Sequence, residues 1–311
     1  MGSKSKQKKQ RAEELAAVYA AVDAAEPAYD SLEFEESPTT AMRARRPVRL
    51  ADVDPRDKTG YDGKKADGVK TLAAMDPVLS DLQERLFAAS RHGAADRVLL
   101  IIQGMDTAGK GGIVRHVIGT VDPQGVHHHA FKAPSEEELE HDFLWRIENE
   151  IPGEGMIGVF DRSHYEDVLI HRVRGLSSTA EVEGRYAAIR EFEEDLAGRG
   201  VKIVKVMLHI SKDEQAGRLQ ERLDRPEKHW KFDPADIDGR EMWDDYQRAY
   251  EIAIEETDAD HAPWFVVPAD RKWFARIAVQ ELLIEALQDI DPQWPAATFD
   301  VAEQKARLSA E

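Results

Sequence analysis

The sequence predicts an α/β fold in which helices cover both faces of a mostly parallel sheet. Short apolar runs alternate with longer amphipathic stretches from residue 98 onward, as expected of strand–helix–strand units. The first of these runs ends in a glycine-rich turn, and an amphipathic stretch begins directly after it. Ligands of open parallel sheets bind beyond the carboxyl ends of the strands, so this turn lies where a site is expected.

The positions of the apolar residues assign the individual elements. Strands are predicted at residues 98–103, 126–131, 156–160, 201–210 and 264–267. Helices are predicted at residues 72–91, 110–119, 135–150, 164–174, 179–198, 213–224, 240–258 and 271–289. Residues 37–47 are interpreted as a linker and residues 52–68 as irregular surface chain, because turn-forming and charged residues dominate them.

The glycine-rich turn has the pattern of a phosphate-binding loop, Gly-x-x-x-x-Gly-Lys, from Gly104 to Lys110. Glycines let backbone N–H groups turn toward one centre, and the lysine adds a positive charge for the outer phosphates. The usual Ser or Thr that holds magnesium is replaced by Gly111, so Asp106 is the candidate metal ligand. The alternative is a structural turn with an exposed lysine.

A second candidate element follows the apolar strand predicted at residues 156–160. Asp161 ends this strand, where a carboxylate that holds magnesium is expected next to a phosphate loop. Together with Asp106 it could bind the ion directly or through water. Arg162 could offset charge on the transferred group. The alternative is that Asp161 caps the next helix and pairs with Arg162.

A third candidate element is a basic helix face. Arg218, Arg222 and Arg225 recur at i, i+4 and i+7, and Lys228 and Lys231 follow Pro226. Such a face could belong to a lid that closes over phosphates, with Arg222 the foremost candidate. The alternative is a solvated face whose arginines pair with Glu221 and Asp224.

Composition narrows the class of protein. The 311 residues include no cysteine, which excludes disulfides and thiolate chemistry and fits a cytoplasmic location. The formal net charge of −18 argues against nucleic acid or an anionic membrane as partner, although a local basic cluster can still bind a polyanion. No apolar stretch is long enough to span a bilayer, and the lysine-rich start does not resemble a signal peptide.

Several separate motifs, in order, resemble the polyphosphate kinase 2 family across roughly residues 48–292. They are residues 104–110, 122–126, 141–146, 162–169, 228–232 and 262–264. The resemblance implies a three-layer α/β/α P-loop kinase fold with a helical lid. It also implies magnesium-dependent phosphoryl transfer between inorganic polyphosphate and a nucleotide, and it is compatible with a homo-oligomer, either dimer or tetramer.

Carried over by position, the resemblance implies roles for individual residues. Asp106 and Asp161 would serve Mg²⁺, while Lys110, Arg162 and Arg222 would engage the phosphate groups. Glu166 would lie near the nucleotide. Further phosphate contacts are implied for the loop residues Gly104, Met105, Thr107, Ala108, Gly109, Gly111 and Gly112 and for Arg218, Arg225, Lys228 and Lys231 of the lid.

Residues 163–167 look most like the branch of the family that accepts both AMP and ADP. Two positions depart from that branch, which often has Asp where Gly111 stands and Asn where Asp161 stands. The first departure weakens the assignment to this branch. The second adds a carboxylate that would strengthen metal binding. The sequence does not decide between AMP and ADP.

The sequence divides into three parts. Residues 1–45 are expected to be a charged extension, peripheral or mobile, because residues 1–11 carry five basic and no acidic side chains and residues 12–36 carry eight acidic and no basic ones. A helix can form within residues 12–25. Residues 46–295 are the expected P-loop phosphotransferase domain, with the lid at about 213–235, and residues 296–311 a polar tail.

Two other functions are compatible with these residues. An ATP-dependent kinase of a small metabolite or nucleotide would use the same loop and lid. A nucleotide-binding interaction protein would bind phosphate without turnover. Binding alone does not need two carboxylates, a lysine and several arginines, which favours an enzyme.

Overall fold

The predicted sheet is present, and its five strands run parallel. The computed structural model describes residues 34–310, and the strand order within them is β2-β3-β1-β4-β5. The strands are β1 Arg97–Gln103, β2 Val126–Ala130, β3 Ile157–Asp161, β4 Val201–His209 and β5 Trp264–Pro268. The strand that leads into the glycine-rich loop, β1, therefore lies at the centre of the sheet.

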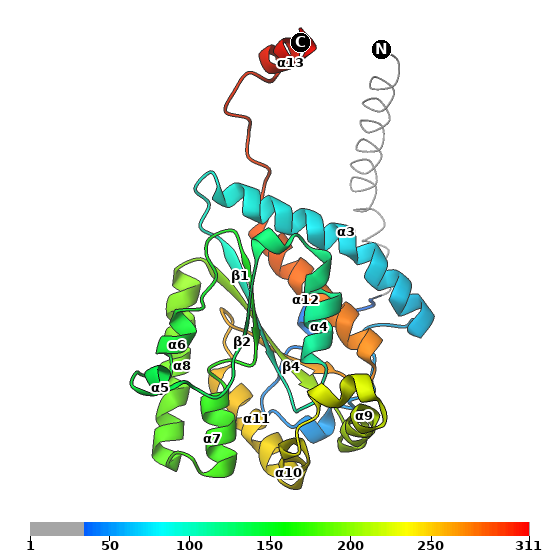
Figure 1. Ribbon diagram of the computed structural model, residues 1–311, viewed down its shortest axis with the longest axis vertical. Helices are drawn as coiled ribbons and strands as arrows, with labels where there is room; N and C mark the ends of the chain where they lie inside the picture. The colour runs from blue at the N-terminus through cyan, green and yellow to red at the C-terminus, as the bar shows by residue number, and fades with distance from the viewer. Residues whose placement is uncertain (1–33, 311) are drawn as a thin grey trace.

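Helices cover both faces of the sheet, which gives three layers and confirms the predicted α/β class (Figure 1). One face is covered by α3 Lys65–Ser90, α4 Lys110–His116 and α12 Lys272–Ile290. The other is covered by α7 Glu166–Arg174, α8 Thr179–Gly198 and α11 Trp243–Thr257. Shorter elements are α2 Pro38–Ala41, η1 Leu50–Asp52, η2 Ile118–Thr120, η3 Pro123–Gly125, α5 Glu136–Leu139 and α6 Trp145–Glu148.

Beyond the carboxyl ends of the strands lies a helical stretch that we call the α9–α10 segment (Figure 1). It consists of α9 Lys212–Asp224, η4 Pro226–Lys231 and α10 Ala235–Glu241. This stretch contains the basic helix face that the sequence singled out.

The core is continuous because the central strands are covered on both sides. Residues 98–103 of β1 are all buried, and so are all residues of β4 except Lys202. Strands of this kind carry unbroken apolar runs instead of alternating patterns. The same burial explains why β1, β3, β4 and β5 could be predicted from short apolar runs, whereas β2 has no buried residue.

Two predicted helices are each divided into two α-helices, and the helix predicted at residues 110–119 is divided into α4 and η2. Residues 135–150 form α5 and α6, because the Asp142 carboxylate accepts the Leu144 N–H at 3.0 Å and starts a new turn. Residues 240–258 are divided between α10 and α11 at Met242, whose ψ of 25° departs from helical geometry. The helix predicted at residues 72–91 begins earlier, at Lys65, within the stretch interpreted as irregular.

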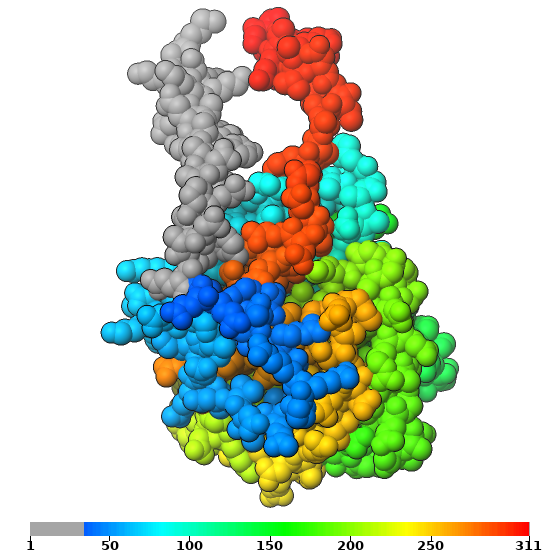
Figure 2. Space-filling view, turned by 180° about the vertical axis from the view of Figure 1, so that it is seen from behind, coloured from blue at the N-terminus to red at the C-terminus, as the bar shows by residue number. Residues whose placement is uncertain are grey.

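Residues 37–47 pack against the body of the molecule and are not a free linker (Figure 2). Arg43 forms an isolated bridge with Phe265 of β5, and its guanidinium pairs with Asp258 at 3.0 Å. The physical reason is that Met42 and Val48 bury apolar surface in the main core. The helix expected within residues 12–25 lies outside the described residues.

The chain after α12 leaves the body of the molecule (Figure 1). It ends in α13 Val301–Ser309, none of whose residues is buried. Within residues 34–310, no helix has the length and the apolar character that crossing a membrane requires.

A fully buried ion pair lies between the sheet and the α8–α11 layer. Lys205 of β4 donates from Nζ to Glu193 at 2.5 Å, to the Tyr165 hydroxyl at 3.0 Å and to the Thr257 carbonyl at 2.8 Å. Burial lowers the pKa of Lys205. Burial alone would raise the pKa of Glu193, but the Lys205 ammonium and His164 together hold it below its ordinary value. Each charge therefore depends on the other.

Replacing one partner of this pair is expected to cost more stability than replacing both. Lys205→Met leaves the Glu193 carboxylate buried without an ammonium partner, which costs about 3–5 kcal/mol of unfolding free energy. The double variant Lys205→Met/Glu193→Leu should recover much of that loss. Urea unfolding followed by circular dichroism measures both. Equal losses in the single and double variants would contradict the interpretation.

Candidate active site

The glycine-rich loop after β1 adopts a conformation that most side chains disfavour. Gly104 has φ +147°, and a Cβ there would lie 2.8 Å from the carbonyl oxygen of Leu208. Gly109 has φ +121° and Thr107 φ +67°, so a residue other than glycine also stands in the left-handed region. Strain of this kind is concentrated where function requires it.

Several backbone amides of the loop have no acceptor among the described residues. The N–H groups of Thr107, Gly109, Lys110 and Gly111 donate to no acceptor within residues 34–310. Lys110 donates from Nζ to the Gly104 carbonyl at 2.8 Å, which places its ammonium across the loop. Convergent free amides beside an ammonium group form an anion-binding concavity.

The acidic end of β3 lies beside this loop, as the sequence predicted. Asp161 is paired in register with Ile102 of β1, and the Arg162 N–H donates to the Ile102 carbonyl at 3.1 Å. The Arg162 guanidinium then reaches Asp106 inside the loop, at 3.1 Å from Oδ1. The two sequence motifs therefore meet at one edge of the sheet.

Arg162 is held in its charged form by the acidic groups around it. Burial alone would lower its pKa, but Glu166, Asp106 and Asp161 are among the groups that raise it above the ordinary value. Its backbone φ of +66° is in the left-handed region, so its position is imposed by the surrounding structure. A permanent cation is thereby fixed between the loop and the strand end.

Glu166, the first residue of α7, lies near Arg162 and Lys110. We call the glycine-rich loop, Asp161, Arg162 and Glu166 together the phosphate centre. Burial raises the pKa of Glu166, and the nearby Arg162 and Lys110 partly offset that rise. The Gln103 amide lies between Glu166 and Ser163. Oriented to satisfy both, it donates to Glu166 at 3.1 Å and accepts from the Ser163 N–H at 3.2 Å.

Three residues of this centre were missed by the sequence interpretation. Tyr250 of α11 is buried, and burial, followed by Glu166 and Asp106, raises its pKa well above the ordinary value. Asp236 of α10 has a raised pKa because of burial and of Asp106 nearby. Gln103 is the third. None of the three belongs to a sequence motif, so nothing in the local sequence marked it as a residue of the site.

The basic side chains of the α9–α10 segment mostly contact acidic groups of the same segment. Arg222 pairs with Asp236 at 3.0 Å and also donates to the Lys231 carbonyl at 2.8 Å. Arg225 pairs with Glu221 and Glu227, at 3.2 and 2.5 Å. These are partly exposed pairs, which contribute little stability and can exchange for another anion.

Lys228, Lys231 and Arg218 differ in their surroundings. Lys228 pairs with Glu221 at 2.6 Å. Lys231 places its ammonium 4.9 Å from the ring centre of Trp230, whose side chain is 78% exposed. Arg218, in contrast, is buried against the loop itself, and its contacts are with protein atoms.

The carboxylates at this edge have the chemistry that Mg²⁺ prefers. Asp106 and Asp161 would supply hard oxygen ligands, as a magnesium site requires. Across residues 34–310, no three His, Cys, Asp or Glu residues are grouped so that they could hold a metal by themselves. A bound Mg²⁺ would therefore complete its shell with water and phosphate oxygens, which is its usual behaviour beside phosphates.

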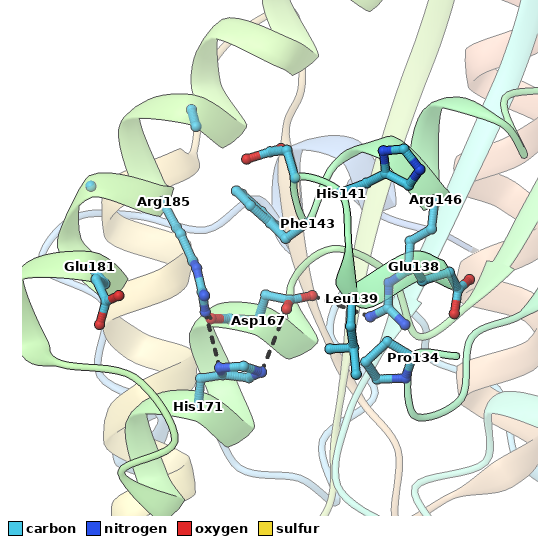
Figure 3. A pocket seen from close by; sticks show the side chains of 13 residues that line it. Pro134, Glu138, Leu139, His141, Phe143, Arg146, Asp167, His171, Glu181 and Arg185 are labelled. Carbon is cyan, nitrogen blue, oxygen red and sulfur yellow. Dashed lines mark hydrogen bonds and ion pairs between the residues drawn. The ribbon is translucent and has the colours of Figure 1, made fainter. Parts of the chain in front are cut away.

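A cavity of about 530 Å³ opens between the chain around α5 and helices α7 and α8 (Figure 3). Phe143 and Leu139 line one side, from the chain around α5, and Arg185 and His171 line the other, from α8 and α7. The Arg185 guanidinium lies 5.4 Å from the Phe143 ring centre. Cavities of this size and mixed polarity are typical of small-molecule sites.

Asp167 lines this cavity and directly follows Glu166 in the sequence. Its carboxylate is 3.2 Å from Arg146 and 3.5 Å from His171, and its carbonyl accepts from Arg185 at 2.7 Å. Asp167 thus fixes three basic side chains of the cavity wall, those of Arg146, His171 and Arg185.

The fold and the site together define a P-loop phosphotransferase. Free loop amides, a lysine across the loop and an arginine between two carboxylates are suited to positioning phosphates and offsetting their charge, which is what phosphoryl transfer requires. The model of the polyphosphate kinase 2 family (PPK2) matches residues 63–295, and the chain belongs to this family.

Individual relatives agree with the family assignment. The chain is 46% identical over 246 residues to an AMP/ADP-polyphosphate phosphotransferase from Meiothermus ruber, covering 79% of this chain and 91% of the relative. It is 47% identical over 232 residues to an ADP-polyphosphate phosphotransferase from Rhodopseudomonas palustris, covering 71% and 79%. A crystal structure of polyphosphate kinase 2 from Arthrobacter aurescens is 56% identical, with a TM-score of 0.88 and coverage of 90% and 99%.

Proposed function

We propose that this chain transfers phosphoryl groups between inorganic polyphosphate and both AMP and ADP, with Mg²⁺ as cofactor. Membership of the polyphosphate kinase 2 family makes polyphosphate–nucleotide phosphotransfer the general activity. The range of acceptors, the metal and the roles of individual residues go beyond this general activity, and they are what we propose. The observation that supports it is the contact between Arg162 and Asp106, at 3.1 Å, which joins the loop to the strand end.

The acceptor range rests on the relatives and on the motif at residues 163–167. One relative is named for both AMP and ADP, at 46% identity, and another for ADP alone, at 47%. Coverage is greater for the first, which supports the wider acceptor range. Both AMP and ADP are therefore proposed as acceptors, giving ADP and ATP.

The proposed roles follow from position and charge. Free loop amides and Lys110 bind the phosphates at the loop, and Arg162 offsets charge on the group in transfer. Asp106 and Asp161 would hold Mg²⁺, which supplies further charge neutralisation when bound. The α9–α10 segment is the proposed lid, with Arg222 exchanging Asp236 for a phosphate oxygen when the segment closes.

We assign the cavity around Phe143 and Arg185 to the nucleoside of the acceptor. Asp167 lines this cavity and directly follows Glu166 in the sequence, so the acceptor phosphate would lie on the Glu166 side of it. His141, Asp142, Phe143 and Arg146, which line it, belong to the motif at residues 141–146 that resembles the family. An aromatic ring and fixed polar groups suit a base and a ribose.

We infer a cytoplasmic location and a homo-oligomeric state, dimer or tetramer, from the same resemblance. The cysteine-free sequence fits a reducing compartment. A net charge of −18 disfavours nucleic acid or an anionic membrane as a further partner.

A matrix of donors and acceptors tests the proposed function. With Mg²⁺ and polyphosphate as the sole donor, AMP should yield ADP and ADP should yield ATP, separated by ion-exchange chromatography. Lys110→Ala should keep its fold and lose about 10²–10³-fold in kcat, as expected for one lost charge-stabilising group. Turnover with ATP but not with polyphosphate would identify an ATP-dependent kinase instead, and binding without turnover a non-catalytic protein.

Asp106→Asn should raise the Mg²⁺ concentration that gives half-maximal activity, because an amide oxygen is a weaker ligand than a carboxylate. A magnesium titration at saturating polyphosphate and AMP measures this. Asp289→Asn is the matched control, since Asp289 is 69% exposed and pairs with Lys202 at the amino end of β4. Identical magnesium dependence in wild type and Asp106→Asn would remove Asp106 from the metal site.

Phe143→Ala should raise the KM for AMP by about 3- to 10-fold, the loss expected when an aromatic stacking partner is removed. The KM for tripolyphosphate should stay unchanged, because Phe143 is outside the loop. Phe299→Ala, at a side chain 60% exposed in the chain after α12, is the control. A shift of both KM values together would argue against a dedicated nucleoside cavity.

A further inference from the structure

Helix α9 holds three consecutive backbone carbonyls of the phosphate loop. Gln215 donates from Nε2 to the Asp106 carbonyl at 3.0 Å. One turn later, Arg218 donates from Nη1 to the carbonyls of Thr107 and Ala108, at 2.9 and 2.8 Å. Residues three apart lie on the same helix face, so one face of α9 forms hydrogen bonds with one stretch of the loop.

Arg218 has no N–H group left for a phosphate. Besides its two bonds to the loop, it donates from Nε to Glu214 at 2.8 Å. From Nη2 it donates to the carbonyls of Ala269 and Asp270, at 2.6 and 3.1 Å. A guanidinium has five N–H donors, and these five bonds use all of them. The side chain is 6% exposed, and it contacts the loop through the carbonyl groups of Thr107 and Ala108.

Fixing these carbonyls determines where the loop amides point. In a planar trans peptide the C=O and the following N–H point in opposite directions. Holding the Asp106 carbonyl toward Gln215 therefore turns the Thr107 N–H away from α9, and holding the Ala108 carbonyl turns the Gly109 N–H the same way. Both amides are among those without an acceptor in residues 34–310, whereas Ala108 N–H donates to Met105 at 3.0 Å.

We propose that Gln215 and Arg218 are positioning residues that orient the phosphate-binding amides of the loop by holding its carbonyls. The inference rests on the proposed function, because the amides matter only if the loop binds phosphate. It gives Arg218 a different role from that of Arg222, although both stand on the basic face of α9. It also accounts for the left-handed φ of Thr107, whose carbonyl Arg218 holds.

Gln215 connects the phosphate loop to α10, because it bonds both the Asp106 carbonyl and Arg240. Its side-chain oxygen accepts from Arg240 of α10 at 2.9 Å, and Arg240 also donates to the Lys212 carbonyl at 2.8 Å. Gln215 itself is 1% exposed and carries no charge. Any effect of Gln215 on phosphate binding must therefore pass through the loop, since it offers no charge of its own to the anion.

The test is the affinity for inorganic tripolyphosphate, measured by calorimetry without nucleotide. Gln215→Met keeps the length of the side chain but removes the donor, and we expect binding about tenfold weaker, as for one lost buried hydrogen bond. Arg218→Lys keeps the charge but not the fork, and should lose at least as much. Gln220→Met, at an exposed glutamine of α9 that bonds Asp224, is the matched control. AMP affinity should be unchanged in all three variants.

The outcomes separate the inference from the proposed function. Wild-type tripolyphosphate affinity in Gln215→Met, or in Arg218→Lys, would overturn the positioning role while leaving the phosphate loop intact. Absence of tripolyphosphate binding by the wild type would remove the proposed function itself. If Gln215→Met does not fold, Arg240→Met carries the test. It loosens Gln215 from the partly exposed side, so a two- to fivefold loss is expected and no loss overturns the proposal.

Discussion

The parallel pairing of β1 with β3 is the constraint on which the site depends. It sets Ile102 beside Asp161, so the two strands end together and the chains that follow them emerge at the same edge. Arg162 is then anchored by the Ile102 carbonyl and reaches Asp106 across the gap. A shift of this register would separate the loop from the carboxylate, and the two motifs would no longer share a centre.

The negative charge around this centre is only partly balanced by its own cations. Asp106, Asp161 and Glu166 would repel each other without compensation, and Arg162 stands among them as a permanent cation. Even so, the pKa values of Glu166 and Asp236 are raised, because burial is not fully offset. The centre thus holds more negative charge than its own cations stabilise well, which suits the arrival of further positive charge together with a phosphate.

The fold could be predicted because the central strands are buried on both faces and carry unbroken apolar runs. The convergence of the glycine-rich loop with the end of β3 also followed, since parallel strands end at one edge, but the ion pair between Arg162 and Asp106 did not. Other features depend on contacts that sequence spacing does not record. Arg218 shares a helix face with Arg222, but only the tertiary structure shows that its donors end on loop carbonyls. Tyr250 and the helix break at Met242 likewise reflect packing and local dihedral angles.

The direction of the strands also determines on which side of the molecule the chain after α12 lies. Because β5 runs parallel to its neighbours, α12 must return toward the amino edge, and α13 emerges at the end opposite the α9–α10 segment (Figure 1). The C-terminus therefore offers a natural anchoring point. A tag, fusion partner or solid support joined there would extend away from the catalytic edge and leave substrate entry unobstructed.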